Sequence, residues 1–308
     1  MDGVLNINKP SGPTSHDVVA ITRRATGIKR IGHTGTLDPL ASGVLVVCIG
    51  NATRVIEYMS GWRKSYRATA VLGAETDSED ITGEVVSESD CCHVTREDLD
   101  AVLPPFIGPI LQVPPMVSAV KHKGRRLYEM ARKGEVVERA PRPVEILSLR
   151  VIDIEPGEKA SFTMEVTCSG GTYIRTLCAD IGKALGCGAY MSSLVRTGVG
   201  PFRVEDAVTL EQVEQAASEG RLQEIVRPID EVLVDMPMAM VSHQDEALVM
   251  NGVVLSEGRF EPRGSMPSVA EHVRIHAQGG RLIGIGMLRR GPDGMLELKP
   301  EKVFSGSE

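Results

Sequence analysis

The chain has 308 residues, of which 42% are hydrophobic and 24% are charged, and its formal net charge is −7. This length favours a main domain with a smaller second one, and the composition is that of an ordinary globular protein. No segment has the apolar length needed to cross a bilayer, and the N-terminus lacks the basic start of a secretion signal, so we expect a cytoplasmic protein. The six cysteines form no Cys-x-x-Cys pair, which argues against a zinc site and against a disulfide framework.

The first fifty residues predict a strand, a helix, a loop and a second strand. Residues 1–9 alternate weakly in hydrophobicity, and the prolines of residues 10–13 end that strand. Thr14 or Ser15 can cap a helix that ends near Gly27. The next loop carries Asp38 and leads into a buried apolar strand, residues 44–49. An Asp-Pro pair by itself is most often a turn whose carboxylate caps its own backbone.

Charge is unevenly distributed in the middle of the chain. A predicted strand, residues 65–73, precedes an acidic stretch, residues 77–100, which has nine acids against Arg96 alone and begins with what we interpret as a solvated loop. A helix capped by Thr95 is expected within it. Residues 121–150 have nine basic and four acidic side chains, a net charge of +5. Such a segment is either a solvated surface or a contact for phosphates.

The second half of the chain begins with two predicted strands, residues 144–154 and 160–168. A helix then runs from about Tyr173 to Leu185. Arg175 lies in its first turn, where a cation faces the unfavourable end of the helix dipole, so an acidic partner would explain its position. If that partner is Asp38, we expect the arginine to lower the pKa of the aspartate. Further on we expect a helix capped by Thr209, and then short β-like runs beyond about residue 241.

Three motifs in this order carry a resemblance to a known family. They are KPSGPTS at residues 9–15, GHTGTLDPLASGVL at residues 32–45 and GTYIRTL at residues 171–177. The chain resembles the TruB family of tRNA pseudouridine-55 synthases, bacterial type. The resemblance implies an α+β fold, with a mixed sheet flanked by helices in a catalytic domain, residues 1–240. A thumb-like insertion that grips RNA would occupy about residues 115–145, and a small PUA-like β-barrel that binds RNA would occupy residues 241–308.

The same resemblance implies the activity and the site. The enzyme would convert uridine 55 in the T loop of tRNA to pseudouridine after flipping the base. The reaction is redox-neutral, so we expect no cofactor and no metal. The chemistry needs a carboxylate as nucleophile or base, and whether it acts at C1′, at C6 or on the 2′ proton stays open. The implied catalytic residues are Asp38, Arg175 and Tyr66, and the implied substrate-binding residues are His33, Tyr66, Tyr173, Leu194 and Lys9.

Individual roles are also implied, with alternatives for some of them. Tyr66 would stack on the uracil, and His33 would fill the space that the flipped nucleotide leaves. Leu194 would line the pocket, although it could equally be a core residue. Lys9 would have either a structural role or an RNA contact. Val117 departs from the family, which usually has a tyrosine at that position.

A different class of function is an RNA-binding scaffold. Such a protein would be a tRNA chaperone without catalysis, or the protein subunit of a guide-RNA-directed pseudouridylation complex. The basic insertion and the absence of a long lysine-rich tail favour a stand-alone enzyme. We therefore expect tRNA, through its T arm, as the partner, with no membrane, no required protein partner and a monomeric state.

Overall fold

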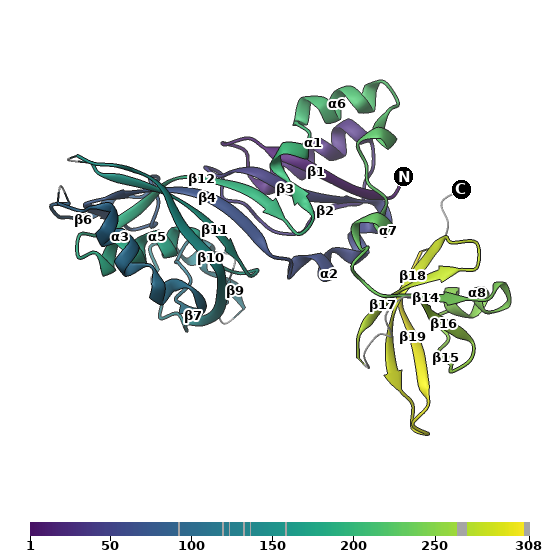
Figure 1. Ribbon diagram of the computed structural model, residues 1–308. Helices are drawn as coiled ribbons and strands as arrows, with labels where there is room; N and C mark the ends of the chain where they lie inside the picture. The colour runs from purple at the N-terminus through teal and green to yellow at the C-terminus, as the bar shows by residue number, and fades with distance from the viewer. Residues whose placement is uncertain are drawn as a thin grey trace.

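The computed structural model describes residues 1–91, 93–118, 120–122, 124–131, 133–135, 137–157, 159–263 and 270–304. Figure 1 shows an elongated part built on a long twisted sheet, and a smaller part, mostly of strands, formed by the C-terminal residues. This mixture of a helix-flanked sheet and a second small sheet confirms the predicted α+β class.

The large sheet has nine strands in the described part, and its main path is β1-β3-β12-β4-β11-β10-β7. In this path only β3 and β12 run parallel, through two residue pairs. Gly43 belongs to one of these pairs, and a Cβ there would lie 2.3 Å from the carbonyl oxygen of Arg196, so glycine permits the close approach. The strands are β1 (Gly3–Lys9), β2 (Ile31–His33), β3 (Ser42–Ile49), β4 (Lys64–Leu72), β7 (Gly108–Gln112), β10 (Arg142–Glu155), β11 (Ser161–Cys168), β12 (Ala189–Val199) and β13 (Phe202–Arg203).

Local signals placed the main helices correctly. Thr14, Thr95 and Thr209 each accept a hydrogen bond from the backbone three residues later and complete a capping box. Gly27 ends the first helix with φ 69°. The longer helices are α1 (Ser15–Thr26), α3 (Arg96–Val102), α5 (Ile174–Ala184) and α6 (Leu210–Ser218), and the short ones are α2 (Ile56–Ser60), α4 (Leu127–Ala131) and α7 (Ile229–Val232).

Between these elements lie two small hairpins, β5 (Ala74–Thr76) with β6 (Val85–Glu88) and β8 (Lys121–His122) with β9 (Arg125–Arg126). The edge strand β7 is absent from the predicted elements, because residues 108–112 are too short a run to give a periodic signal.

One face of the sheet carries the core that supports the site. Along β4, Tyr66, Ala68 and Ala70 are buried, whereas the residues between them are partly or fully exposed. This period of two places one side of the strand against α5. Leu37, Leu177 and Leu194 belong to the same apolar cluster, so the predicted loop, helix and pocket wall converge on one side of the sheet.

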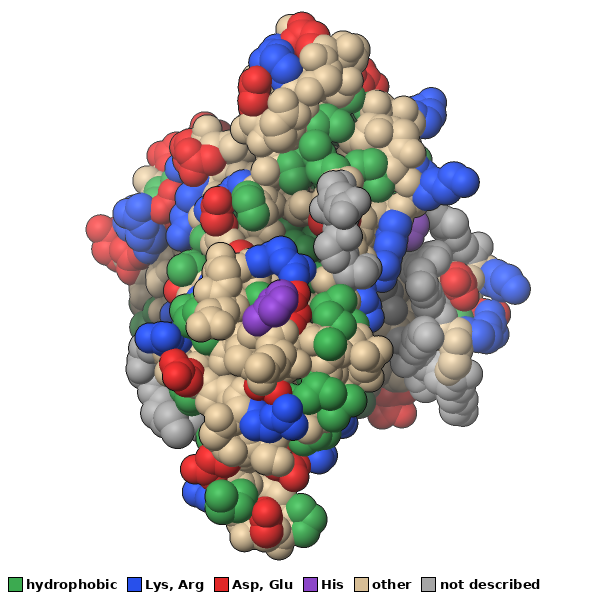
Figure 2. Space-filling view, turned by 90° about the vertical axis from the view of Figure 1, so that its right-hand side faces the viewer, with side chains coloured by type: hydrophobic (Ala, Val, Ile, Leu, Met, Phe, Trp, Pro, Cys, Tyr) green, Lys and Arg blue, Asp and Glu red, His purple; other side chains and the backbone are tan. Residues whose placement is uncertain are grey.

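The C-terminal sheet is a curled half-barrel of six strands, in the order β15-β19-β18-β17-β14-β16. Its first strand begins at Met238, three residues before the expected boundary at residue 241. Figure 2 looks onto this end of the molecule and shows acidic and basic side chains interspersed. Its elements are β14 (Met238–Val241), α8 (His243–Met250), β15 (Leu255–Ser256), β16 (Phe260–Arg263), β17 (His272–Ala277), β18 (Leu282–Arg290) and β19 (Leu296–Val303).

The half-barrel is packed against the large sheet. Ile285 and Phe304 are buried in one apolar cluster with Val46 of β3. Lys302 forms an ion pair with Glu57 of α2 at 2.7 Å. Within the described ranges, no helix combines the length and apolar character that crossing a membrane requires.

Candidate active site

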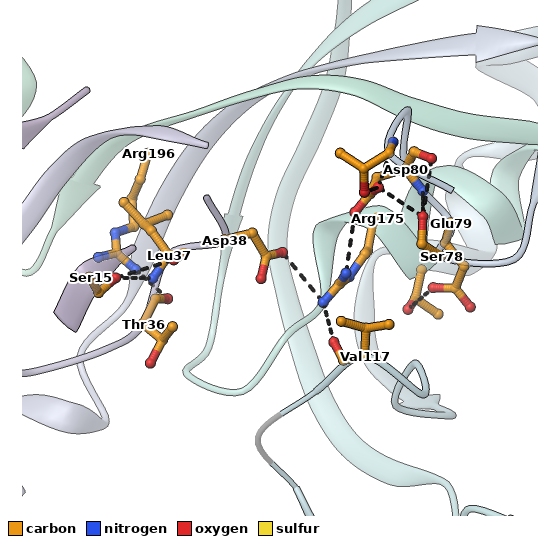
Figure 3. A network of polar contacts seen from close by, with 12 residues as sticks. Ser15, Thr36, Leu37, Asp38, Ser78, Glu79, Asp80, Val117, Arg175 and Arg196 are labelled. Carbon is orange, nitrogen blue, oxygen red and sulfur yellow. Dashed lines mark hydrogen bonds and ion pairs between the residues drawn. The ribbon is translucent and has the colours of Figure 1, made fainter. Parts of the chain in front are cut away.

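Asp38 and Arg175 lie together, as predicted from the placement of the arginine. Asp38 is in the loop that joins β2 to β3, and its side chain is 35% exposed. Arg175 comes from the first turn of α5 and is only 4% exposed. Its Nη2 atom lies 3.4 Å from Oδ2 of Asp38 (Figure 3). The pair thus joins a buried cation to a carboxylate that remains accessible.

A second carboxylate, Asp80, also holds this guanidinium. Nη1 of Arg175 donates to Oδ2 of Asp80 at 3.3 Å, and both side chains are 4% exposed. Nη2 donates in addition to the main-chain carbonyl of Val117 at 2.6 Å. Two acids near the start of α5 therefore explain how a cation is tolerated at a helix N-terminus.

The interpretation of the loop around Asp80 as solvated is wrong. Ser78 and Asp80 are buried. Oδ1 of Asp80 accepts hydrogen bonds from the Ser78 hydroxyl at 2.8 Å and from the Thr82 amide at 2.9 Å. These bonds aim Oδ2 at Arg175. The sequence showed only a dense run of polar residues, and the partner that buries it is 95 residues away.

The pKa of Asp38 also differs from the expectation. Burial raises this pKa above its ordinary value, and the negative charge of Asp80 adds to the increase. Arg175 acts in the opposite direction, as predicted, but does not outweigh the burial. A carboxylate with a raised pKa is a stronger base than one whose pKa an arginine has lowered.

Lys9 supports the Asp38 loop through hydrogen bonds to its main chain. Its side chain is fully buried, and its Nζ atom donates to the carbonyls of Pro10 at 2.9 Å, Pro39 at 3.2 Å and Ala41 at 2.6 Å. Burial lowers the pKa of this lysine to about 8, although the nearby Asp38 opposes the change. These three hydrogen bonds give Lys9 the structural role, one of the two that the sequence left open, while its role as a substrate-binding residue stays a prediction.

Arg196, which the sequence interpretation did not assign to the site, holds the other side of the loop. It is 1% exposed. From β12 it donates to the carbonyls of Val44 at 2.7 Å, Gly35 at 3.0 Å and Thr36 at 3.3 Å. Figure 3 shows it beside Thr36 and Leu37, on the loop segment that precedes Asp38. Two buried cations, Lys9 and Arg196, therefore fix the loop through its carbonyl oxygens.

Two of the predicted pocket residues, Tyr66 and Leu194, lie beside this loop. Tyr66 and Leu194 are each 7% exposed and share an apolar cluster with Leu37. Burial raises the pKa of Tyr66, so its ring stays a neutral phenol, and its hydroxyl interacts with Arg196. Tyr173 immediately precedes α5 and is partly buried.

His33 ends β2 and is partly buried, with its ring centroid 5.5 Å from that of His16. Burial lowers the pKa of His33 to about 4, and His16 and Arg196 contribute to the decrease. A histidine with this pKa is neutral near pH 7. Among the described contacts no hydrogen bond joins His33 to Asp38, so general base catalysis by this histidine gains no support.

Comparison with family models defines the class of protein. The N-terminal domain of TruB family pseudouridylate synthases matches residues 23–174, and the C-terminal domain of tRNA pseudouridylate synthase B matches residues 175–234. The fold agrees with this class. An H/ACA RNP bound to a substrate RNA containing 2′-deoxyuridine holds a chain that is 27% identical, with a TM-score of 0.75, over 99% of this chain and 85% of that chain.

Similar proteins extend along most of the sequence. The tRNA pseudouridine synthase B of Symbiobacterium thermophilum is 53% identical over 253 residues, which cover 82% of this chain and 83% of that protein. The protein of the same name from Moorella thermoacetica is 45% identical over 305 residues, which cover 98% of this chain and 99% of that protein. The chain therefore belongs to the TruB family of pseudouridylate synthases and is an isomerase, as the three motifs predicted.

Proposed function

We propose that the enzyme isomerises uridine 55 in the T loop of tRNA to pseudouridine, with Asp38 as the reacting carboxylate. The names of its relatives support tRNA as the substrate. The observation that carries the assignment of Asp38 is its position: an accessible carboxylate, paired with a buried arginine, on a loop that two buried cations hold in place.

The reaction breaks the bond between N1 of uracil and C1′, turns the ring and forms a bond between C5 and C1′. The proton on C5 leaves, and N1 gains one, so atoms and electrons balance without an external oxidant or reductant. Attack at C1′, attack at C6 and removal of the 2′ proton each require one carboxylate close to the ribose or to the uracil ring. Asp38 supplies it, and Arg175 compensates its charge when the site is closed to water.

The base must leave the stacked loop before it reaches Asp38, and flipping costs a few kcal/mol. In our proposal Tyr66 stacks on the uracil, while Leu194 and Tyr173 line the pocket. Stacking of this kind contributes about 1–3 kcal/mol per base, which offsets part of that cost. His33, neutral near pH 7, fills the space that the nucleotide vacates, because a flat aromatic ring can stack on the neighbouring bases.

The rate should fall on acidification at a pH above the ordinary pKa of an aspartate, 3.8, because burial raises the pKa of Asp38 and only the ionised form can attack or accept a proton. Single-turnover pseudouridine formation, measured between about pH 4 and 8 with folding checked by circular dichroism, gives the midpoint. A rate that stays constant down to about pH 4 in folded protein would contradict this interpretation of the site.

The basic residues 121–150 should contact phosphates. The side chains of Lys121, Lys123 and Arg126 lie outside the described part, so this prediction rests on charge. Replacing all three with alanine should weaken tRNA binding and reduce the log–log salt slope by about 0.9 for each duplex phosphate that the variant no longer neutralises. As the control, three ion-paired arginines outside the predicted RNA-binding parts, Arg67, Arg96 and Arg221, are replaced in the same way. Equal slopes for the two triple variants would exclude a phosphate contact at residues 121–150.

The guide-directed scaffold is the alternative, and the likeness to an H/ACA RNP chain keeps it open. The identity of 45–53% to tRNA pseudouridine synthase B proteins favours the stand-alone enzyme, as does the basic insertion. A T-arm stem-loop without any guide RNA separates the two. We expect full conversion of this stem-loop by the isolated monomeric protein, whereas activity only after addition of a guide particle would support the scaffold.

A further inference from the structure

The segment that leads from β7 into the thumb-like insertion contains a buried polar residue, Gln112. It is 1% exposed although β7 is the last strand of the sheet path. Both ends of its amide are used by one residue of the main chain: the amide of Tyr173 donates to Oε1 at 3.0 Å, and Nε2 donates to the carbonyl of Tyr173 at 3.2 Å. The side chain thus binds the Tyr173 backbone as a neighbouring strand would.

Five residues further on, the same segment contacts α5 a second time. The carbonyl of Val117 accepts from Nη2 of Arg175 at 2.6 Å. That nitrogen also lies 3.4 Å from Oδ2 of Asp38 (Figure 3). One nitrogen of Arg175 therefore contacts both the Asp38 loop and residues 112–117, which we call the root of the insertion. The contact uses the main chain and is therefore independent of the side chain that replaces the usual family tyrosine.

These contacts lie at the start of α5. Tyr173 is the N-cap residue of α5, and its own side chain makes no capping hydrogen bond. The Nε atom of Arg175 is buried without a hydrogen-bond partner in the described part. Among the described residues, the guanidinium is therefore held only through its two terminal nitrogens, by Asp38, Asp80 and the Val117 carbonyl.

We propose that Gln112 is a positioning residue of the reaction, which fixes the backbone at Tyr173 against the root of the insertion and thereby sets the distance between Arg175 and Asp38. Residues 112–117 then connect the insertion that is proposed to grip RNA to the ion pair of Arg175 and Asp38, so the position of one depends on the position of the other. This inference rests on the proposed function. It adds a residue that touches neither Asp38 nor, in our proposal, the RNA.

The test uses the full-length protein and a T-arm stem-loop under single-turnover conditions. Gln112→Met keeps the length of the side chain and removes both hydrogen bonds. We expect the rate at saturating RNA to fall roughly 10- to 100-fold, because a small displacement of a catalytic group has an effect of this size. The dissociation constant should change less than about threefold, because phosphate contacts dominate affinity. Gln215→Met, at a surface position of α6, is the matched control and should leave both values unchanged.

Two further readouts separate positioning from a general loss of stability. Because Arg175 lowers the pKa of Asp38, a displaced arginine should move the acid limb of the Gln112→Met rate profile to higher pH. Partial unfolding would lower the rate without moving this limb. Gln112→Glu keeps the acceptor for the Tyr173 amide and regains a donor when protonated. Its rate, relative to that of Gln112→Met, should therefore rise on acidification.

Two results would overturn the proposal. The first is a normal rate and an unshifted acid limb in Gln112→Met while Asp38→Asn is inactive. The second, decisive if Gln112→Met does not fold, is a Gln112→Glu rate that keeps a constant ratio to wild type at every pH. If wild-type protein itself forms no pseudouridine in the stem-loop, the proposed function fails instead, so the two failures are distinguishable.

Discussion

Asp38→Asn is expected to abolish pseudouridine formation while the protein still folds and binds the T arm. Asparagine keeps the size of the side chain and its ability to form a turn, but it can act neither as a nucleophile nor as a base. The loop should keep its shape, because Lys9 and Arg196 hold it through main-chain carbonyls and not through the carboxylate. We expect a rate at least about 10³-fold lower in a single-turnover assay.

Binding by this variant should remain close to that of wild type, because affinity comes mainly from phosphate contacts and stacked bases. Removing one anion from a site that also contains Asp80 can even tighten binding slightly. Asp153→Asn, an exposed aspartate on β10, serves as the control and should be fully active. Pseudouridine formation by Asp38→Asn within tenfold of wild type would refute the assigned chemistry. Arg175→Lys should lose less activity, because the charge stays while the planar fork is lost.

Arg196→Met is expected to have the largest effect on stability. The guanidinium is 1% exposed and donates to three carbonyls, at Gly35, Thr36 and Val44. Methionine fills much of the volume but leaves one buried and two partly buried acceptors unpaired, and a buried one costs about 1–3 kcal/mol. Allowing for partial relaxation, we expect the free energy of unfolding to fall by about 3–5 kcal/mol. Chemical denaturation with urea measures the change.

The activity of Arg196→Met should fall further than its folded fraction, because the loop that carries Asp38 loses one of its two buried supports. Arg221→Met, at a half-exposed position paired with Glu219 and Glu224, is the control and should leave stability close to that of wild type, because exposed ion pairs contribute little. Equal stability changes in the two variants would show that the carbonyl contacts of Arg196 contribute little. The stability of Arg196→Lys should lie between the stabilities of these two variants, since lysine restores the charge but cannot reach three separated acceptors.

The sequence by itself determined the elements whose signals are local. Thr14 or Ser15, Thr95 and Thr209 predicted three helix starts, because a cap and the first turn that it serves lie within four consecutive residues. The position of Arg175 in a first helical turn, together with the motif around Asp38, predicted their ion pair, since a cation at a helix N-terminus requires an acidic partner. The class of fold and the family followed from the three ordered motifs.

Only the tertiary structure decided how that pair is supported. Asp80, Gln112 and Arg196 contact their site partners across 61 to 161 residues, and no local pattern encodes a contact of that separation. Burial likewise depends on the whole fold. It made Lys9 a support of the loop, and it raised the pKa of Asp38 where the neighbouring arginine alone would have lowered it. A sequence shows which charges are present, whereas desolvation depends on what packs around them.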